Sequence, residues 1–355
     1  MEKNELQKDI SKIIYDGIQA PSGENSQPWQ FIVDKNVIHV LNIENRDSTL
    51  YNSGQHGSFV AHGALIENMV ISASHYGYRV EITTFPSGDS GVIAKLVLHE
   101  EPIAEDPLYA SIHHRQTNRH KYNKIPISKA NQALLVDACA EFEGNVFKIV
   151  DDPDKLDILA NASATVERLM FRNKAFHRFF FKHFFEKQYD EHEPSGLYID
   201  TLGMSAFEKF GIKLIKNWPI AYLFNLLGIA RINSRMRAQH YRQSAAFGVV
   251  VTYGDQPHDY LEAGRAMERV WLKSTELGIS LQPCVGVLYL WEGLMKNAES
   301  VFSESDKNLV ETARNQILEV FEVQGKTIPM FFRMGYNNEK SRRAFRYEPR
   351  IDYIS

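Results

Sequence analysis

A loop at residues 21–29, Pro-Ser-Gly-Glu-Asn-Ser-Gln-Pro-Trp, combines short polar side chains with residues that enforce an irregular backbone. Two prolines and a glycine interrupt regular pairing, so main-chain N–H groups there stay available to a ligand. Ser22, Asn25 and Gln27 add short polar side chains to these donors. The alternative is an ordinary capped turn with Trp29 in the core, and the residue types alone favour that alternative.

A second segment, Arg115-Gln116-Thr117-Asn118-Arg119, places two arginines around a hydroxyl and an amide. The planar guanidinium of arginine is a bidentate donor for phosphate, although a solvated basic turn has the same composition. His113 and His114 precede the segment. No carboxylate or third histidine stands beside them at ligand spacing, so we expect no metal site.

Two later segments could complete a binding site. Lys340-Ser341-Arg342-Arg343 could pair with a phosphate dianion, or could be a frayed basic tail. In the stretch 277–286, Pro283 and Gly286 indicate a strand broken by a close backbone approach, for which a packing reason is the alternative. We interpret Cys284, within that stretch, as an apolar residue rather than a nucleophile.

The elements that must position these segments follow from hydrophobic periodicity. The pattern predicts helices over 4–19, 59–75, 129–141 and 261–277. It predicts strands over 30–33, 37–41, 80–85, 92–99, 146–150, 245–252 and 328–334. Residues 155–243 are mostly helical in pattern, including a basic, Phe-rich helix over 168–187 that could be a lid, a buried helix or a membrane-surface helix.

An internal repeat links two of the predicted helices. Residues 62–78 align with residues 263–279, and Gly63, Glu67 and Gly77 match Gly264, Glu268 and Gly278. Two amphipathic helices that end in glycine can look alike by chance. Because a strand-like segment follows each helix, we favour duplication.

Together these segments resemble the nitroreductase superfamily, and most closely its Acg-like branch. The resemblance rests on the loop at 21–29, the Arg115–Arg119 segment followed by Tyr122 and Pro126, the turn at 277–286, and Lys340-Ser341-Arg342. It implies an α+β fold of two fused nitroreductase-like units, each a mainly antiparallel sheet flanked by helices, forming an intramolecular pseudo-dimer. The units would span 1–110 and 111–355, the second with a helical lid insertion at about 155–235.

The resemblance also implies one FMN per chain, bound between the units. The implied cofactor-binding residues are Pro21, Ser22, Gly23, Asn25, Arg115, Gln116, Thr117, Arg119, Pro283, Val285, Gly286, Lys340, Arg342 and Arg343. Arg115, Thr117, Lys340 and Arg342 would hold the phosphate, and main chain near Val285 would face the reactive edge of the ring. Residues 141–145 would be the shrunken counterpart of the loop, leaving a second, defunct site.

The implied activity is hydride transfer from NAD(P)H to the flavin and onward to a nitro compound, quinone or other small acceptor. No catalytic side chain is assigned. The alternative is an FMN-sequestering protein whose lid covers the flavin and limits turnover. Two departures from the family pattern are Thr117 in place of serine, which keeps the hydroxyl, and Val285 in place of glutamate, which keeps only the main-chain donor.

Composition excludes several other classes of partner. The formal net charge of −4 and pI of about 6.4 give no basic footprint for nucleic acid. Two cysteines form no disulfide framework, and no run of about 18 apolar residues suits a bilayer. Without an apolar run in residues 1–12, we expect no signal peptide and a cytoplasmic protein, either a monomeric pseudo-dimer or a weak homodimer, with no stable membrane insertion.

Overall fold

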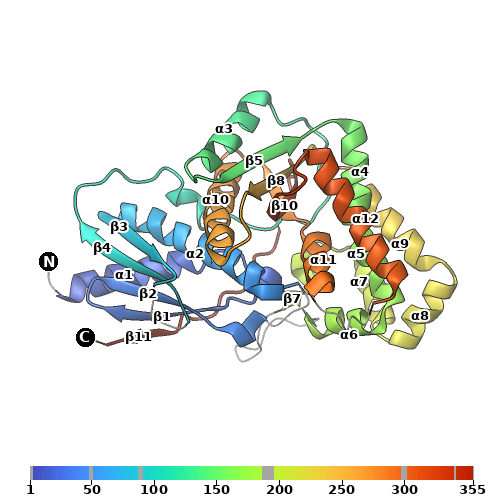
Figure 1. Cartoon of the computed structure of the whole chain (residues 1–355), viewed down its shortest axis with the longest axis horizontal. Coiled ribbons are helices and arrows are strands. Elements are labelled where there is room, and N and C mark those ends of the chain that lie inside the picture. The colour runs from blue at the N-terminus through green and yellow to red at the C-terminus, as the bar shows by residue number, and fades with distance from the viewer. Residues whose placement is uncertain are drawn as a thin grey trace.

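The computed structural model describes residues 3–47, 51–86, 91–185, 196–296, 302–339 and 341–354. All the predicted helices outside the insertion are present: α1 (Lys3–Gly17), α2 (His56–His75), α3 (Lys129–Ala140) and α10 (Pro257–Glu276) (Figure 1). The predicted strands are also confirmed, as β1 (Trp29–Asp34), β2 (Val37–Asn42), β3 (Tyr78–Thr84), β4 (Val92–Glu100), β5 (Asn145–Val150), β8 (Ala246–Thr252) and β10 (Thr327–Gly335). Short 3-10 turns lie at Gly23–Asn25, Glu44–Asp47, Ser53–Gln55, Tyr109–Ser111 and Ile199–Leu202.

The two main sheets have the same topology. The first has the order β11-β1-β2-β4-β3 and the second the order β5-β8-β10-β9, where β9 is Ser280–Pro283 and β11 is Ile351–Tyr353. If β11 is set aside, each sheet has four strands. Across each sheet, the strand that comes first in the chain lies beside the second, the second beside the fourth, and the fourth beside the third. Every neighbouring pair is antiparallel. In each, one helix precedes the first strand and a long helix joins the second to the third. The expected α+β fold with antiparallel sheets is therefore confirmed.

The long helices of the two halves, α2 and α10, pack against each other at the centre of the molecule (Figure 1). A Cβ atom on Gly63 would lie 2.0 Å from the carbonyl oxygen of Leu261, and one on Gly264 would lie 2.2 Å from that of Val60. Because these contacts are to backbone, only glycine allows the helices to approach so closely. The glycines that the repeat aligns thus face each other where the helices meet.

One hydrophobic core runs through both halves. Buried side chains from β1, α2, α10 and β10 belong to a single cluster that includes Phe31, Leu65, Val270 and Phe332. The last strand, β11, pairs in parallel with β1, with Phe31 opposite Ile351. The end of the chain therefore completes the sheet of the first half. The boundary near residue 110 stays a prediction.

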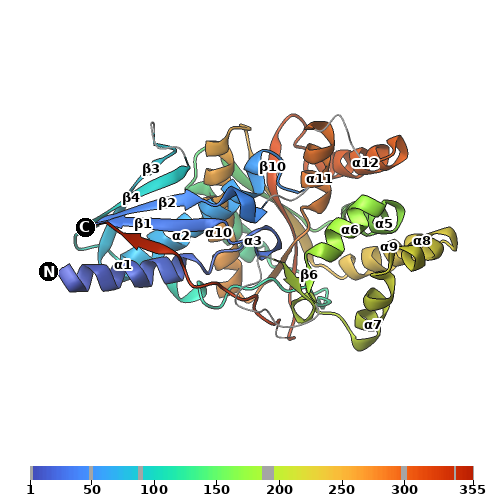
Figure 2. The same cartoon turned by 90° about the horizontal axis from the view of Figure 1, so that it is seen from below.

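The insertion between β5 and β8 is helical, as predicted. Its helices are α4 (Pro153–Ser163), α5 (Thr165–Arg172), α6 (Lys174–Lys182), α7 (Ala206–Ile215), α8 (Trp218–Leu226) and α9 (Ile229–Tyr241), and they form one end of the molecule (Figure 2). Two short strands, β6 (Phe184–Phe185) and β7 (Leu197–Tyr198), pair in parallel beside them.

The prediction of a single helix over 168–187 is wrong, because α5 and α6 divide this stretch at Asn173. Asn173 has an extended backbone, with φ −118° and ψ 117°, and its side chain accepts a hydrogen bond from the N–H of Phe176 at 2.9 Å. Asn173 therefore ends α5 and caps α6. The Phe-rich stretch is also mostly covered, since Phe176, Phe181 and Phe184 are buried. The buried phenylalanines of this stretch therefore do not form an apolar membrane-facing stripe.

Two helices of the second half have no counterpart in the sequence-based predictions: α11 (Gly286–Lys296) and α12 (Glu304–Phe321). Beyond β10 the basic segment is extended, and it leads into β11 across the first half (Figure 2). A frayed tail is therefore excluded for residues 341–354. Lys340, one of the predicted site residues, lies outside the described residues.

Candidate functional site

A cavity of about 340 Å³ lies where the two halves meet, a size typical of small-molecule sites. Its floor includes Val60 and Ala61 of α2 and Met267 and Trp271 of α10. Thirteen of the fourteen predicted site residues line it: Pro21, Ser22, Gly23, Asn25, Arg115, Gln116, Thr117, Arg119, Pro283, Val285, Gly286, Arg342 and Arg343. Four segments that are far apart in sequence therefore share one cavity.

The loop before β1 forms one wall of the cavity. Residues 23–25 make a single 3-10 turn in which Glu24 and Asn25 have positive φ angles of 48° and 59°. The Ser22 hydroxyl accepts a hydrogen bond from the N–H of Gln27 at 3.0 Å, which closes the turn. Trp29 is buried and begins β1. The segment is thus both a capped turn with a core tryptophan and a cavity wall, so the two interpretations of the sequence are compatible.

The amides of this loop hold the C-terminal segment. Asn25 donates from Nδ2 to the carbonyl of Phe345 at 3.1 Å and accepts at Oδ1 from Arg346 at 2.9 Å. The Oε1 atom of Gln27 accepts from the N–H of Tyr347 at 3.0 Å. Asn25 therefore lines the cavity while its amide is engaged with residues 345–346. These contacts fix the basic segment against the first half.

Arg115 lies buried beside the cavity. Its Nε is 3.1 Å from Glu268 Oε1, its Nη2 donates to the carbonyl of Gln19 at 2.6 Å, and its guanidinium lies 4.6 Å from the centre of the Trp271 ring. Burial lowers the pKa of Arg115, while the charge of Glu268 opposes that shift. Burial also raises the pKa of Glu268 to about 7, against the attraction of Arg115. The arginine is thus held in a fixed orientation.

Other arginines converge on the same cavity. Arg119 donates to the carbonyl of Thr201 at 3.0 Å, and burial lowers the pKa of Arg119 to about 10. Arg342 lies 3.2 Å from Asp200, and Arg343 donates to Gln19 Oε1 at 3.1 Å. Five arginines line the cavity, against two acidic residues. Such an excess of guanidinium groups suits an anionic ligand.

The turn at 283–286 adds backbone donors. Strand β9 ends at Pro283 and α11 begins at Gly286, and the carbonyl of Val285 accepts from the N–H groups of Leu288 and Tyr289 at 2.9 and 3.2 Å. The first N–H groups of a helix have no partner within it, so this terminus presents donors and a partial positive charge to the cavity.

Cys284, in the same turn, is not an ionised nucleophile. Its main-chain N–H donates to the carbonyl of Phe331 at 2.8 Å, which anchors the turn to β10. Burial raises the pKa of the Cys284 thiol to about 11, so the group stays protonated at neutral pH. This agrees with its interpretation as an apolar residue.

The segment at 115–119 is positioned by the same strand. Thr117 forms an isolated parallel bridge with Leu281 of β9, and the N–H of Asn118 donates to the carbonyl of Leu281 at 3.0 Å. Asn118 also donates from Nδ2 to the hydroxyl of Ser280 at 3.2 Å. The predicted arginine segment and the predicted turn are therefore neighbours in space.

The sequence analysis missed Glu24, which also lines the cavity. Burial raises the pKa of Glu24 to about 8, and the nearby charge of Asp47 raises it further. His183 of the insertion places Nδ1 3.5 Å from the carboxyl. At neutral pH Glu24 is therefore mostly protonated, and it can donate a hydrogen bond. Its place between Gly23 and Asn25 was the one available signal, because burial cannot be read from the sequence.

Arg346 and the individual lining residues of the predicted lid insertion were not named in advance. Arg346 follows the three basic residues of the segment at 340–343 in the sequence. Its contact with the loop at 21–29 depends on the path of the C-terminal segment, which the sequence does not give. From the insertion, Phe180, Gly196, Leu197 and Thr201 line the cavity. No pattern in the sequence relates these residues to the loop at 21–29.

The histidines before the arginine segment have no metal-binding neighbours among residues 3–47, 51–86, 91–185, 196–296, 302–339 and 341–354. His113 pairs through Nε2 with Asp16 at 2.7 Å. Within those ranges, no group of three or more His, Cys, Asp or Glu side chains is placed to hold a metal ion. Nor does any helix in that part of the chain have the length and apolar character needed to cross a membrane.

Comparison with known proteins gives distant similarities. No family model matches the chain. An uncharacterized protein of Mycobacterium tuberculosis (strain CDC 1551 / Oshkosh) is 21% identical over 272 residues, which are 75% of this chain and 37% of that protein. The chain therefore spans little more than a third of the length of that relative.

Three solved structures illustrate the structural similarities. A nitroreductase-like family protein from Bacillus cereus is 10% identical with a TM-score of 0.36, over 69% of this chain and 93% of that chain. The FMN-dependent nitroreductase NfnB from Mycobacterium smegmatis, in complex with NADPH, is 12% identical with a TM-score of 0.37, over 66% of this chain and 92% of that chain. A nitroreductase with bound FMN from Desulfitobacterium hafniense DCB-2 is 12% identical with a TM-score of 0.36, over 68% of this chain and 94% of that chain. With TM-scores below 0.5, none of these similarities decides the function, which has to be argued from the site.

Proposed function

We propose that this chain binds one FMN in the cavity between its halves and works as a nitroreductase-like oxidoreductase. The observation that carries the proposal is the convergence of the loop at 21–25, the segment at 115–119, the turn at 283–286 and the basic tail on one cavity. The loop comes from the first half and the other three come from the second.

The cavity residues fit FMN in three respects. Trp271, Met267 and Met330 supply apolar surface for a flat ring system. The arginines supply donors for a phosphate dianion. The N-terminus of α11 supplies main-chain donors for the polar edge of a ring. These are the parts that a flavin mononucleotide needs: an apolar slot with a cationic end and a donor-rich edge.

When bound, FMN would supply the redox chemistry, accepting a hydride from NAD(P)H and passing electrons to a small acceptor such as a nitro compound or quinone. The chain's own residues bind and orient. Arg115 and Arg342 are assigned to the phosphate, and the main chain near Val285 to the reactive edge of the ring. Glu24 lines the cavity, and burial raises its pKa to about 8, so its carboxyl can donate a hydrogen bond to a bound ligand at neutral pH.

The chain is further proposed to be two fused nitroreductase-like units. The repeated strand order of the two sheets and the facing glycines of α2 and α10 support this view. Because the binding segments are divided unequally between the units, only one complete site per chain is expected.

Flavin content tests this proposal directly. Gentle purification followed by reconstitution with FMN should give about one flavin per chain, measured by absorbance against protein concentration. A value near two would contradict the single-site arrangement. No binding after reconstitution would contradict FMN as the ligand.

A second function, sequestration of FMN, is favoured by one feature. Phe180, Leu197 and Thr201 of the insertion line the cavity and could exclude a nicotinamide. Anaerobic mixing of the loaded protein with NADPH separates the two functions. Rapid loss of the flavin's visible absorption supports the oxidoreductase, and persistent absorption supports sequestration.

A further inference from the structure

The insertion carries an unusual surface on α7, α8 and α9, at the end of the molecule away from both termini (Figures 1 and 2). In the part of the chain that is described, nineteen large apolar side chains are exposed, and nine of them lie between residues 207 and 236. They are Phe207, Phe210, Leu214, Tyr222, Leu223, Leu226, Leu227, Ile232 and Met236. We call these nine side chains and the basic residues among them the α7–α9 face.

The exposed apolar side chains follow helical spacing. Phe207, Phe210 and Leu214 lie three and four residues apart on α7, and Ile232 and Met236 lie four apart on α9. Phe207 and Phe210 are 82% and 67% exposed, so they stand out from the surface rather than cover a core. Each helix therefore presents an apolar stripe that is unpartnered within the described chain.

The charge of this region is opposite to that of the chain. Residues 205–242 contain seven lysines and arginines and one acidic residue, whereas the whole chain has a formal net charge of −4. Some of these cations pair with carboxylates outside the three helices: Lys209 with Asp200, and Arg237 with Glu167. The basic residues are interleaved with the apolar ones rather than separated from them.

A basic cavity adjoins the same helices. It has a volume of about 910 Å³, and its lining includes Arg168, Lys174, Trp218, Leu226 and Arg231. The one acidic residue in the lining, Asp306, is paired with Arg172 at 2.8 Å. A cationic hollow with an apolar rim suits the phosphodiester headgroup of a lipid.

From these observations we infer that the α7–α9 face docks the protein on the surface of an anionic phospholipid membrane. Interleaved apolar and basic side chains are typical of surfaces that lie in the membrane interface without crossing the bilayer. A symmetric dimer through this face is unfavourable because it would bring two like-charged surfaces together. A purely acidic partner would leave the nine apolar side chains exposed. The inference does not depend on FMN binding.

Co-sedimentation with vesicles tests the inference on the full chain. We expect binding to vesicles of phosphatidylglycerol and phosphatidylcholine, weak binding to phosphatidylcholine alone, and loss of binding as salt rises. The variant Phe207→Ser/Phe210→Ser/Leu226→Ser/Leu227→Ser should lower the partition coefficient at least about tenfold, as expected for lost apolar burial. A matched control, Ile125→Ser/Leu134→Ser/Ile354→Ser, removes exposed apolar side chains elsewhere and should bind like the wild type.

The charge variant Arg231→Glu/Arg235→Glu should also lose binding to anionic vesicles, which keeps the test valid if the serine variant does not fold. Equal binding to neutral and anionic vesicles, or no binding to either, would overturn the inference. So would a stable dimer in solution that the serine substitutions dissociate, because the face would then be an interface between copies.

Discussion

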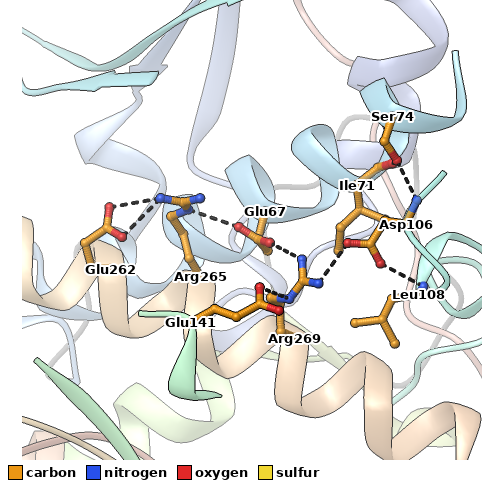
Figure 3. Close-up of polar contacts among 9 residues, drawn as sticks. All are labelled: Glu67, Ile71, Ser74, Asp106, Leu108, Glu141, Glu262, Arg265 and Arg269. Atoms are coloured by element: carbon orange, nitrogen blue, oxygen red, sulfur yellow. Dashed lines mark hydrogen bonds and ion pairs between the residues drawn. The ribbon is translucent and has the colours of Figure 1, made fainter. Parts of the chain in front are cut away.

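The two flanks of the α2–α10 helix pair correspond in sequence but differ in what they enclose. On one flank Glu268 faces Arg115 beside the cavity. On the other, the aligned residue Glu67 lies 3.0 Å from Arg265 and 2.8 Å from Arg269 (Figure 3). We call these the cavity flank and the filled flank. In both, a buried glutamate of a central helix pairs with arginine.

On the filled flank the arginines are saturated by carboxylates. Arg269 pairs through Nη1 with Glu67, through Nη2 with Asp106 at 2.8 Å and through Nε with Glu141 at 3.2 Å (Figure 3). Arg265 also pairs with Glu262. Because every nitrogen of Arg269 is bound to a carboxylate, few of its N–H donors remain for a phosphate.

The segment at 141–145 closes this flank. Glu141 binds Arg269, and Phe142 lies under the guanidinium of Arg265 at 5.2 Å. On the cavity flank the longer loop at 21–29, its proposed counterpart, lines the cavity through residues 21–25. On the proposal of two fused units, a shortened loop and added acidic residues fill one of the two equivalent positions with ion pairs, and one binding site is left.

The largest effect on stability is expected where α2 and α10 meet, between the two flanks. Gly264→Ala places a Cβ atom 2.2 Å from the carbonyl oxygen of Val60, so α2 and α10 must move apart. We expect the free energy of unfolding to fall by roughly 3 kcal/mol or more, since backbone cannot yield as a side chain can. Urea unfolding of the apoprotein measures this change.

Gly211→Ala is the matched control, because a Cβ atom on this helical glycine of α7 meets nothing within 4 Å. It should stabilise the chain by up to about 1 kcal/mol through helix propensity. Equal loss of stability in both variants would show that the close helix approach is not what Gly264 provides.

A smaller, pH-dependent effect should arise on the cavity flank from Glu24. Burial raises the pKa of Glu24 from 4.5 to about 8, so between these values the folded chain binds a proton that the unfolded chain has lost. The free energy of unfolding should therefore fall as pH rises through this window, by up to about 3 kcal/mol at pH 7. Glu24→Gln keeps a neutral side chain and should flatten that slope, as measured by urea unfolding of the apoprotein from pH 5 to 8.

Glu311→Gln serves as the control because it removes an exposed carboxylate of α12 that does not line the cavity. Its slope should match that of the wild type. If Glu24→Gln also keeps the wild-type slope, Glu24 is not the buried acid that distinguishes this flank.

Much of this arrangement could be predicted because it is locally encoded. Helical and strand periodicity located the main elements of both sheets, and the aligned Gly63 and Gly264 do lie where the two long helices meet. The loop at 21–29 could be predicted as irregular from its prolines and glycine. Each of these signals lies within a short window of sequence.

The parts that could not be predicted depend on distant contacts. Strand β11 has three residues, and it is a strand because β1 offers its edge. The role of Arg346 follows from the path of the tail past Asn25, and the raised pKa of Glu24 follows from burial that the insertion helps to create. The break at Asn173 was a local signal, an N-cap residue, that the run of phenylalanines obscured.

The smallest expected effect in free energy is also the sharpest test of the difference between the flanks. The variant Arg115→Met/Glu268→Gln removes the buried ion pair of the cavity flank, and Arg269→Met/Glu67→Gln removes one ion pair of the filled flank, where Glu67 aligns with Glu268. If Arg115 holds the FMN phosphate, its loss should cost roughly 1.5–3 kcal/mol of binding, or about 10- to 150-fold in the dissociation constant. The filled-flank variant should bind FMN like the wild type, since its arginines are committed to carboxylates.

Flavin titration of the apoproteins measures the dissociation constants of both variants, and circular dichroism checks that they fold. Equal losses in the two variants would mean that the effect is structural, and no loss in the first would remove Arg115 from the site.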